Sequence, residues 1–340
     1  MGRKLRRAFT LVELLIVMLI IAVLAMLAWG ALAGAAEQAK ESRTRSIVMK
    51  LDNLVMQRFD GYRTRPLPIP RFSGQPPKSE PFTDANANGF WDSGEPFIDS
   101  NNSGGYNRGA AFSRLMAIRE LQRCELPERI SDLCTAAELA DLADNDLDAM
   151  AVASGPLVVS LMSPPATARM MRRKAAQTIN AGQPWTMAHE SAECLYLIVS
   201  TMQDGDKNAL DFFMPGEIGD VDQDGQREIV DGWGNPIEFL RWAPGFVGGS
   251  VLTMQSLAVP DPFDPVKEDA RQTFALHPLI YSAGADKLYD INVGNPVYSM
   301  MFSPNDPYFA GGVVGAEADS NSDGYWSPAD NITNHYRPPN

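Results

Sequence analysis

The chain contains few of the residues that carry redox, zinc or general-base chemistry. Its 340 residues include only three cysteines and three histidines. The cysteines form no Cys-x-x-Cys pair, so nothing in the sequence indicates a zinc or dithiol redox site. The histidines are widely scattered, and the chain has neither a His-Glu-x-x-His motif nor a serine nucleophile elbow. We therefore expect no catalytic activity.

The three thiols leave two interpretations open. In an exported domain, Cys124 and Cys134 would close a short disulfide loop and leave Cys194 over. Alternatively, all three are unpaired thiols, and Cys194 lies in an apolar stretch that is typical of a buried segment.

Positive charge is scarce as well. Lysine and arginine number 29 against 42 aspartates and glutamates, which gives a formal net charge of −13 at pH 7. Contact with nucleic-acid phosphates needs clustered basic side chains, so we expect no nucleic acid among the partners. The acidic excess instead favours divalent cations as ligands and a surface that is solvated outside the membrane.

A long hydrophobic run begins the chain, behind a short leader with the basic residues Arg3, Lys4, Arg6 and Arg7. No charged side chain occurs from residue 14 to residue 36, which corresponds to about 34 Å of helix and is enough to cross a bilayer. Glu13 stands at the head of this run. A lone carboxylate in a membrane helix costs about 2.5–3.5 kcal/mol on insertion scales, so we expect Glu13 to have a specific partner.

At this end the chain resembles the type IV pilin and pseudopilin family. The family pattern is a basic leader, a small residue, then Phe-Thr-Leu-x-Glu-Leu and an apolar run, and residues 8–14 read Ala-Phe-Thr-Leu-Val-Glu-Leu. The resemblance implies that a prepilin peptidase cuts between Ala8 and Phe9 and that the new Phe9 amino group is methylated. It also implies that Glu13 pairs with the terminal amine of a neighbouring subunit in a filament. Ala8 departs from the glycine that the family usually has.

The resemblance implies several partners: other pilin or pseudopilin subunits, the prepilin peptidase, the inner-membrane assembly machinery and the lipid bilayer. It implies a single-pass protein of the inner (cytoplasmic) membrane, with the C-terminal domain outside the cytoplasm, that later enters the filament. Other interpretations stay open. Residues 6–11 resemble a twin-arginine export signal, and Ala31-Leu32-Ala33 resembles a signal-peptidase site. A plain anchor would suit a calcium-binding adhesion or binding module.

Apolar periodicity continues beyond the membrane-like run. Residues spaced three and four apart form one face, namely Ile47, Val48, Leu51, Leu54, Val55 and Phe59. Gly61 and Pro66 end the pattern. The sequence therefore predicts one helix over 9–60, with its first half in the membrane and its second half packed on a soluble domain.

The predicted fold class is α+β, with the long N-terminal helix packed on a C-terminal antiparallel sheet. After a leader (1–8) and the helix (9–60), we expect a Pro/Gly/Asp-rich segment (61–110), an inserted mainly helical region (111–205) and a pseudopilin-like sheet (206–340). Helices are predicted near 110–121, 138–150 and 166–180, and 193–202 is either a strand or a buried helix. Strand-like runs cover 236–242, 251–257 and 276–282.

Acidic loops repeat along the chain. Three of them match a twelve-residue calcium loop, which has oxygen ligands at positions 1, 3, 5, 9 and 12, glycine at 6 and a backbone carbonyl at 7. The predicted ligands of the first loop are Asp84, Asn86, Asn88, Phe90, Asp92 and Glu95. Those of the second loop are Asp220, Asp222, Asp224, Gln226, Glu228 and Asp231. Those of the third loop are Asp319, Asn321, Asp323, Tyr325, Ser327 and Asp330. A fourth loop starts with Asp99 and Asn101 but has no acid at position 12.

The spacing suits calcium because this ion takes six to eight hard oxygens at about 2.3–2.6 Å, and alternate side chains of a tight loop converge. Asp, Asn and Gly are ordinary turn residues too, but turn composition does not account for three full matches. We predict calcium as a structural cofactor. The irregular sequence after the first loop argues against helix-loop-helix calcium sensors.

Two further motifs indicate a branch of the family. Residues 231–236 read Asp-Gly-Trp-Gly-Asn-Pro and resemble the Asp-x-Trp-Gly-Asn-Pro signature of major pseudopilins of type II secretion. Residues 282–286 resemble the Ser-x-Gly-x-Asp loop that holds calcium in those proteins, which makes Asp286 and Asp290 candidate ligands. The long insert before Trp233 departs from the shorter major pseudopilins and fits an accessory or tip subunit better. Pilus and secretion pseudopilus both remain open.

Overall fold

The computed structural model describes residues 11–67, 75–133, 164–179, 185–247, 254–294, 306–308, 314–318 and 331–335. Several predictions fall outside these residues: the cleavage pair Ala8 and Phe9, the helix over 138–150, Cys134, and the third acidic loop from Asp319 to Asp330.

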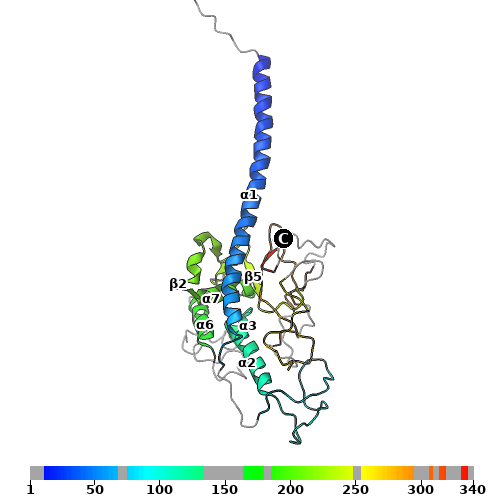
Figure 1. Ribbon diagram of the computed structural model, residues 1–340. Coiled ribbons are helices and arrows are strands. Elements are labelled where there is room, and N and C mark those ends of the chain that lie inside the picture. Colours follow the sequence, from blue (N-terminus) through cyan, green and yellow to red (C-terminus); the bar gives the residue numbers. More distant parts are fainter. Residues whose placement is uncertain are drawn as a thin grey trace, which may run out of the picture.

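Helix α1 (Leu11–Gly61) dominates the molecule. Its 51 residues correspond to about 77 Å of helix. Figure 1 shows that the first half of α1 stands clear of the other elements, whereas the second half lies against them. Among the described residues, α1 is the helix that is long and apolar enough to cross a membrane, and none of its most apolar window is buried. The predicted long helix is therefore confirmed over its described part.

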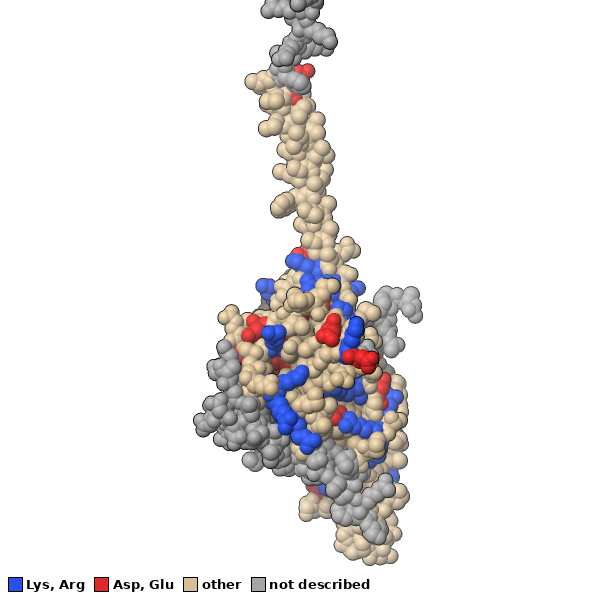
Figure 2. Space-filling view, turned by 90° about the vertical axis from the view of Figure 1, so that its left-hand side faces the viewer, with Lys and Arg blue, Asp and Glu red and all other residues tan. Residues whose placement is uncertain are grey.

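The two halves of α1 differ in the way that the sequence predicts. Large apolar side chains from Leu11 to Leu32 are exposed. In the second half, the buried residues form a stripe that consists of Thr44, Ile47, Val48, Leu51, Leu54, Val55 and Phe59. Burying one large apolar side chain contributes about 1.5–3 kcal/mol, so this stripe is a major contribution to the packing of α1 on the domain. Figure 2 shows the same division, since the projecting part of α1 is almost entirely uncharged and charged side chains gather where the domain begins.

Four shorter α-helices of the described residues follow α1 along the chain. They are α2 (Ala110–Glu125), α3 (Ile130–Leu133), α6 (Ala166–Ile179) and α7 (Glu190–Ser200). The sequence left 193–202 open between a strand and a buried helix, and the structure shows a buried helix. Helix α7 packs against the strands that follow it and also contacts α6 and α1.

Within the described residues, the strands that follow form three small antiparallel sheets. The first sheet pairs β1 (Gln203–Asp204) with β2 (Lys207–Asn208), and the second pairs β3 (Ile218–Gly219) with β4 (Glu228–Ile229). The third contains β5 (Ile237–Leu240), β6 (Leu279–Ser282) and β7 (Ile332–Thr333), in the order β5-β6-β7. Two short 3₁₀ helices, η2 (Ala209–Phe212) and η3 (Pro215–Glu217), lie between β2 and β3. The predicted α+β class is confirmed.

The strand predicted over 251–257 is wrong in its described part, since residues 254–257 form no strand. Gln255 is 1% exposed and turns its side chain inward, where Nε2 donates to Ala243 O at 2.7 Å and to Phe246 O at 3.1 Å. Its Oε1 accepts from His277 N at 2.9 Å. A buried polar side chain that satisfies loop backbone groups has replaced strand pairing here.

The largest apolar cluster among the described residues joins these elements. It combines the buried face of α1 with residues of α2, α6, α7, β5 and β6, including Leu51, Ile118, Leu195 and Phe239. The helices of the inserted region thus share their core with α1 and the sheet.

Candidate functional site

A Gly-Trp-Gly turn fastens the sheet to α1. Gly232 N donates to Thr44 Oγ1 at 2.8 Å, and a Cβ at Gly232 would lie closer than 3.0 Å to backbone atoms of Lys40. Only glycine permits this approach of one backbone to another. Beside it, Trp233 Nε1 donates to Glu37 Oε2 at 2.8 Å. The motif thus joins α1 to the segment before β5.

Asp231 holds this turn together and does not join the other acids of the second loop. Its Oδ1 accepts from Trp233 N at 2.8 Å and from Asn235 N at 2.9 Å. Its Oδ2 accepts from Ser282 Oγ at 2.7 Å. Asn235 Nδ2 donates to Gly284 O at 3.0 Å. The two pseudopilin-like motifs are therefore in direct contact.

The two candidate ligands after Ser282, Asp286 and Asp290, differ in exposure and in hydrogen bonding. Asp286 is exposed and accepts from Leu288 N at 2.8 Å. Asp290 is 4% exposed, and its backbone carbonyl accepts from Ala318 N at 2.8 Å. Among the described residues, neither belongs to a group of three or more ligand atoms that lie close enough to share an ion.

The second acidic loop connects β3 to β4 and is therefore a hairpin loop. Ligand atoms of Asp220, Asp222 and Glu228 lie within 4.8 Å of one another. Asp222 and Asp224 form another such group together with Glu193 of α7. Five carboxylates from two separate elements thus meet around Asp222.

Backbone amides shape this loop. Asp220 Oδ2 accepts from Gly225 N at 3.2 Å, and Glu228 Oε2 accepts from Val221 N at 3.0 Å. Gln226, predicted as a backbone ligand, is buried, and its Nε2 donates to Ala175 O of α6 at 3.2 Å.

Thr186 adds donors from outside the loop. Its backbone N donates to Asp224 Oδ2 at 2.7 Å, and its Oγ1 donates to Asp222 Oδ2 at 2.7 Å. Trp185 Nε1 donates to Glu193 Oε2. All these donors are neutral groups, so they leave the charge of the carboxylates uncompensated.

Burial perturbs two of these acids strongly. Loss of hydration, together with the neighbouring Asp224 and Asp222, raises the pKa of Glu193 to about 10, against the hydrogen bond from Trp185, which lowers it. Loss of hydration likewise raises the pKa of Glu228 to about 7, with added repulsion from Asp222 and Asp220. Without a cation, the poorly hydrated site therefore favours the protonated forms of these two acids, and a bound cation would favour the charged forms.

The sequence analysis missed Glu193. The available signal was a single acid at the start of the apolar run 193–202, because a carboxylate on a buried face needs a partner. The spacing of a loop motif could not reveal it, since Glu193 lies 27 residues before Asp220 in the printed sequence.

The first acidic loop closes on itself. It lies between Phe82 and Phe97, which form an antiparallel bridge. Asp84 accepts from Asn88 N at 3.2 Å and from Gly89 N at 2.7 Å. Glu95, at position 12, accepts from the backbone amides of Ala85 at 2.8 Å and Asp92 at 2.9 Å.

The amide side chains of this loop also face its centre. Asn86 Nδ2 and Asn88 Nδ2 each lie 2.7 Å from Asp92 Oδ2. Their oxygens accept from backbone amides, Asn86 Oδ1 from Asn88 N and Asn88 Oδ1 from Phe90 N. The predicted residues 84, 86, 88, 92 and 95 are thus brought together, but calcium binding would require both amides to turn.

Gly89 docks the first loop on the C-terminal half of the chain. Its carbonyl accepts from Ala270 N at 3.0 Å. A Cβ at this position would collide with Asp269 and Arg271, and φ is +85°. Glycine is needed here both for the backbone conformation and for the close approach.

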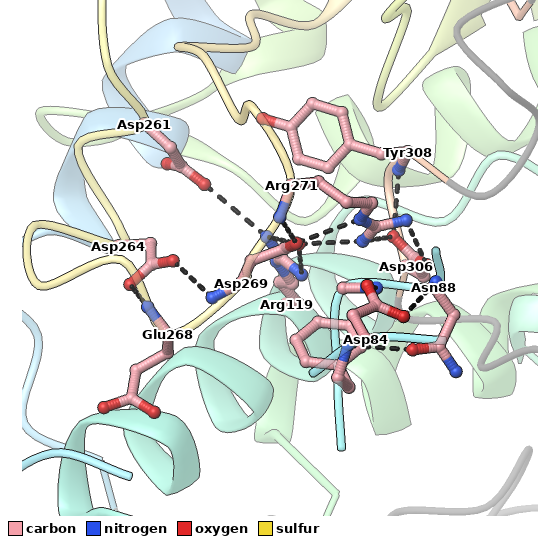
Figure 3. A network of polar contacts seen from close by, with 12 residues as sticks. Asp84, Asn88, Arg119, Asp261, Asp264, Glu268, Asp269, Arg271, Asp306 and Tyr308 are labelled. Carbon is pink, nitrogen blue, oxygen red and sulfur yellow. Dashed lines mark hydrogen bonds and ion pairs between the residues drawn. The ribbon is translucent and has the colours of Figure 1, made fainter. Parts of the chain in front are cut away.

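A buried charged network lies under this contact (Figure 3). Arg119 of α2 is 2% exposed and lies 3.4 Å from Asp269 Oδ2, which also accepts from Arg271 Nη2 at 2.7 Å. The rings of Phe90 and Tyr308 lie 5.5–5.8 Å from both guanidinium groups. Phe90, predicted to offer a backbone carbonyl to calcium, thus also contributes its ring to the docking of the loop.

In the fourth loop, which has no acid at position 12, Glu80 from before the loop takes that place. Asp99 accepts from Ser103 N at 3.0 Å and Gly104 N at 2.8 Å, as Asp84 does in the first loop. Glu80 accepts from Ser100 N at 2.8 Å and Asn107 N at 2.9 Å. These amides occupy positions 2 and 9, which are the positions that Glu95 binds in the first loop.

Asn107 points into this fourth loop. Its Nδ2 lies 2.5 Å from Ser103 Oγ, 3.0 Å from Gly105 O and 3.4 Å from both Asn101 Oδ1 and Glu80 Oε2. The sequence analysis also missed Glu80, because it precedes the loop and no local spacing marks it.

The donor set of the second loop fits calcium. Its side-chain ligands are all hard oxygens, and Glu193 Oε1 and Glu228 Oε1 are buried without a hydrogen-bond partner. Orphaned carboxylate oxygens of this kind are rare unless an ion or water satisfies them. In the described part of the chain, acidic groups that could hold a metal ion are therefore present.

The remaining predicted residues lie at the start of the chain and at the thiols. Glu13 is exposed in the first turn of α1. Cys124 and Cys194 are buried, and burial raises the pKa of the Cys124 thiol to about 11. Because Cys134 lies outside the described residues, the disulfide stays a prediction.

Comparison with known proteins identifies the N-terminal segment. Residues 3–29 match the family model of the prokaryotic N-terminal methylation motif. No curated protein and no solved structure matches the chain. The chain thus carries the prepilin-type signal of type IV pilins and pseudopilins, and the matched segment contains Ala8, Phe9 and Glu13. Together with α1, the signal fits a single-pass inner-membrane anchor with the C-terminal domain outside the cytoplasm.

Proposed function

We propose that the protein is a structural subunit of a type IV pilus or a type II secretion pseudopilus, assembled through α1. The observation that carries the proposal is a methylation motif that leads directly into a helix with an exposed apolar half. A helix surface of Leu, Ile and Val needs a membrane or neighbouring helices to cover it. A pilin-type assembly provides the membrane first and the neighbouring helices later.

Processing creates the group that Glu13 requires. Cleavage by a prepilin peptidase between Ala8 and Phe9 leaves an N-methylated ammonium at the tip of α1. In surroundings of apolar helices, a carboxylate is stabilised strongly by an opposite charge. The amine of one subunit and Glu13 of its neighbour therefore fix the axial register of the filament, and the inner-membrane machinery drives the insertion.

The Gly-Trp-Gly turn favours the pseudopilin branch. Gly232 and Trp233 fasten the domain to α1 between Glu37 and Thr44, where the helix leaves its apolar half. Force on the helix is thereby transmitted to the exported part, which comprises the segments 61–110, 111–205 and 206–340. The helical insert adds bulk beside α1, which suits an accessory or tip position because a filament shaft is crowded.

Calcium stabilises the exported domain in this proposal. Acidic side chains converge at the second loop, which also has the orphaned oxygens described above, and the first and fourth loops fold in the same way around Asp84 and Asp99. Calcium is abundant outside the cytoplasm, where sites with dissociation constants of about 10⁻⁴–10⁻³ M are filled.

N-terminal sequencing of the membrane-extracted protein tests the processing. The expected mature chain begins at Phe9 and carries a methyl group on its amino nitrogen, which mass spectrometry of the first peptide detects. A chain that retains Met1, or that begins after Ala33, contradicts the proposal and favours a plain anchor or an ordinary signal peptide.

A pair of variants tests the assembly. Glu13→Ala should reach the membrane normally but fail to enter filaments, because its neighbour's amine loses its partner. The matched control is Glu41→Ala, which removes an exposed acid that pairs with Arg45 on the same helix. Normal incorporation of Glu13→Ala into sheared filaments would exclude the pairing.

A further inference from the structure

Five carboxylates meet between α7 and the β3–β4 loop. They form two groups around Asp222, one with Glu193 and Asp224 and the other with Asp220 and Glu228. Among the described residues, none of the five forms an ion pair with lysine or arginine. The imidazole of His189, which pairs with Glu238, attracts Asp222 and Glu228 but forms no ion pair with either among the described contacts. Like charges at this separation repel strongly in a poorly hydrated site, so the arrangement requires protons or a cation.

Two buried oxygens give independent support for a cation. Glu193 and Glu228 are both 0% exposed, and the Oε1 atom of each has no hydrogen-bond partner. In each residue the other oxygen is satisfied, Glu193 Oε2 by Trp185 Nε1 and Glu228 Oε2 by Val221 N. The two orphaned oxygens belong to the carboxylates that the other acids face, which is where a metal ion would be coordinated.

We propose that calcium binds between α7 and the β3–β4 loop, with Glu193 as a ligand supplied by the helix. Asp222 and Asp224 provide the loop side of the site, and Asp220 and Glu228 form an adjoining group that shares Asp222. This inference rests on the proposed function as a calcium-stabilised exported subunit and adds a ligand that the loop pattern does not contain.

The role of Asp231 follows from the same geometry. In a twelve-residue calcium loop, position 12 supplies the closing carboxylate. Both oxygens of Asp231 accept hydrogen bonds from the Gly-Trp-Gly turn and from Ser282. The closing carboxylate is therefore Glu193, and Asp231 is a residue of the turn.

Supplying this ligand from α7 changes what the ion does. A loop with all its ligands stabilises only itself, whereas this site ties a surface hairpin to a helix in the centre of the core. Helix α7 packs on β4 and β5, so occupancy of the site fixes the hairpin, the helix and the sheet together.

Terbium, a luminescent substitute for calcium, reports this site in the full-length chain in detergent. Trp185 donates a hydrogen bond to Glu193, so it lies beside the proposed ion and sensitises terbium bound there. Trp91 belongs to the first loop and donates to Glu95 O, so it would sensitise terbium bound there. The signal of the proposed site is therefore the part of the emission that Trp185→Phe removes. Calcium affinity is obtained by displacing this part of the signal.

Glu193→Gln is the decisive variant, because it keeps the shape of the side chain and an acceptor for Trp185 but loses the charge. We expect its calcium affinity at this site to fall by about tenfold or more. Asp231→Asn is the matched control, and its affinity should stay within about threefold of the wild type. Circular dichroism verifies that both variants are folded, and if Glu193→Gln is not, Glu193→Asp is measured with the same expectation.

Three results would overturn the inference: no Trp185-dependent signal, an unchanged affinity in the folded Glu193 variants, or an equal loss in Asp231→Asn. The N-terminus of the same preparation is determined in parallel. A protein that begins at N-methylated Phe9 but lacks the signal refutes this site alone. A protein with another N-terminus that shows the signal refutes the assembly function alone.

Discussion

The first and second acidic loops share one sequence pattern but differ in what surrounds their charges. Asp92 and Asn86 of the first loop are exposed, and the acids of that loop accept hydrogen bonds from the loop's own amides. In the second loop, Asp224 and Glu228 are buried, and Asp222 and Asp224 face Glu193 of another element. Spacing folds both loops in the same way, with the first aspartate accepting from the amide of the glycine at position 6. Burial decides whether the converged charge needs a counterion.

The docking of the first loop gives the largest expected effect. Gly89→Ala should lower the free energy of unfolding by about 3 kcal/mol, because it combines an unfavourable positive φ with a collision at Asp269. The measurement is denaturant unfolding of the full chain in detergent, followed by tryptophan fluorescence.

Gly104→Ala is the matched control for that collision. Gly104 occupies position 6 of the fourth loop with φ +78° but has no atom within 4 Å of its ideal Cβ. Its substitution should cost only about 1 kcal/mol. Equal losses in the two variants would show that backbone strain alone accounts for both.

Calcium binding should stabilise the protein mainly through the second loop, with an effect on the free energy of unfolding slightly smaller than that of Gly89→Ala. At a calcium concentration of about 100 times the dissociation constant, binding adds about 2.7 kcal/mol to the free energy of unfolding. Asp222→Asn, which affects both carboxylate groups of the second loop, should remove most of this gain, whereas Asp92→Asn should remove less. Thermal unfolding with calcium and with a chelator measures the difference, and the reverse order of the two variants would contradict the comparison.

Glu80 extends the comparison to the fourth loop. It is 6% exposed and holds the amides of Ser100 and Asn107. Glu80→Ala leaves both amides unsatisfied and should cost about 2 kcal/mol. Glu95→Ala removes the equivalent acid from the partly exposed first loop and should cost about 1 kcal/mol or less, because water replaces the lost bonds. Faster hydrogen exchange at Ser100 and Asn107 in the Glu80 variant locates the effect, and unchanged exchange there would contradict it.

The smallest expected effect is the pH dependence of stability that the buried His335, outside both loops, contributes. Burial lowers the pKa of His335 to about 4, whereas the unfolded chain has a pKa of about 6.5. The unfolded state therefore binds the proton first, and stability falls as the pH drops from 6.5 toward 4, by about 1–2 kcal/mol at pH 5. His335→Gln should flatten this part of the profile of unfolding free energy against pH. Parallel profiles for the two proteins would assign the acid sensitivity to other groups.

Local patterns in the sequence predicted the elements well. The stripe from Ile47 to Phe59 predicted the buried face of α1, and the helices near 110–121 and 166–180 appear as α2 and α6. The runs 236–242 and 276–282 contain β5 and β6. Each of these predictions depends on periodicity within one segment, which the chain fixes before any tertiary contact forms.

Contacts between segments that are distant in the chain could not be predicted from the sequence. The run 251–257 is apolar enough for a strand, but Gln255 turns inward and the described part forms a loop. Glu193 and Glu80 each approach a loop from elsewhere in the chain, and no spacing rule relates them to it. Asp231 satisfies the loop pattern by position, yet its carboxylate serves the neighbouring turn.

The sequence by itself determined that α1 is one helix with an apolar half, that it follows a methylation motif, and that acidic side chains converge in short loops. Those properties depend on residue spacing and on backbone conformations that glycine permits. Only the tertiary structure decided which converged carboxylates lose their water and which distant acid closes each loop. Hydration and charge neutralisation depend on everything packed around a group, and the order of residues in one segment does not contain that information.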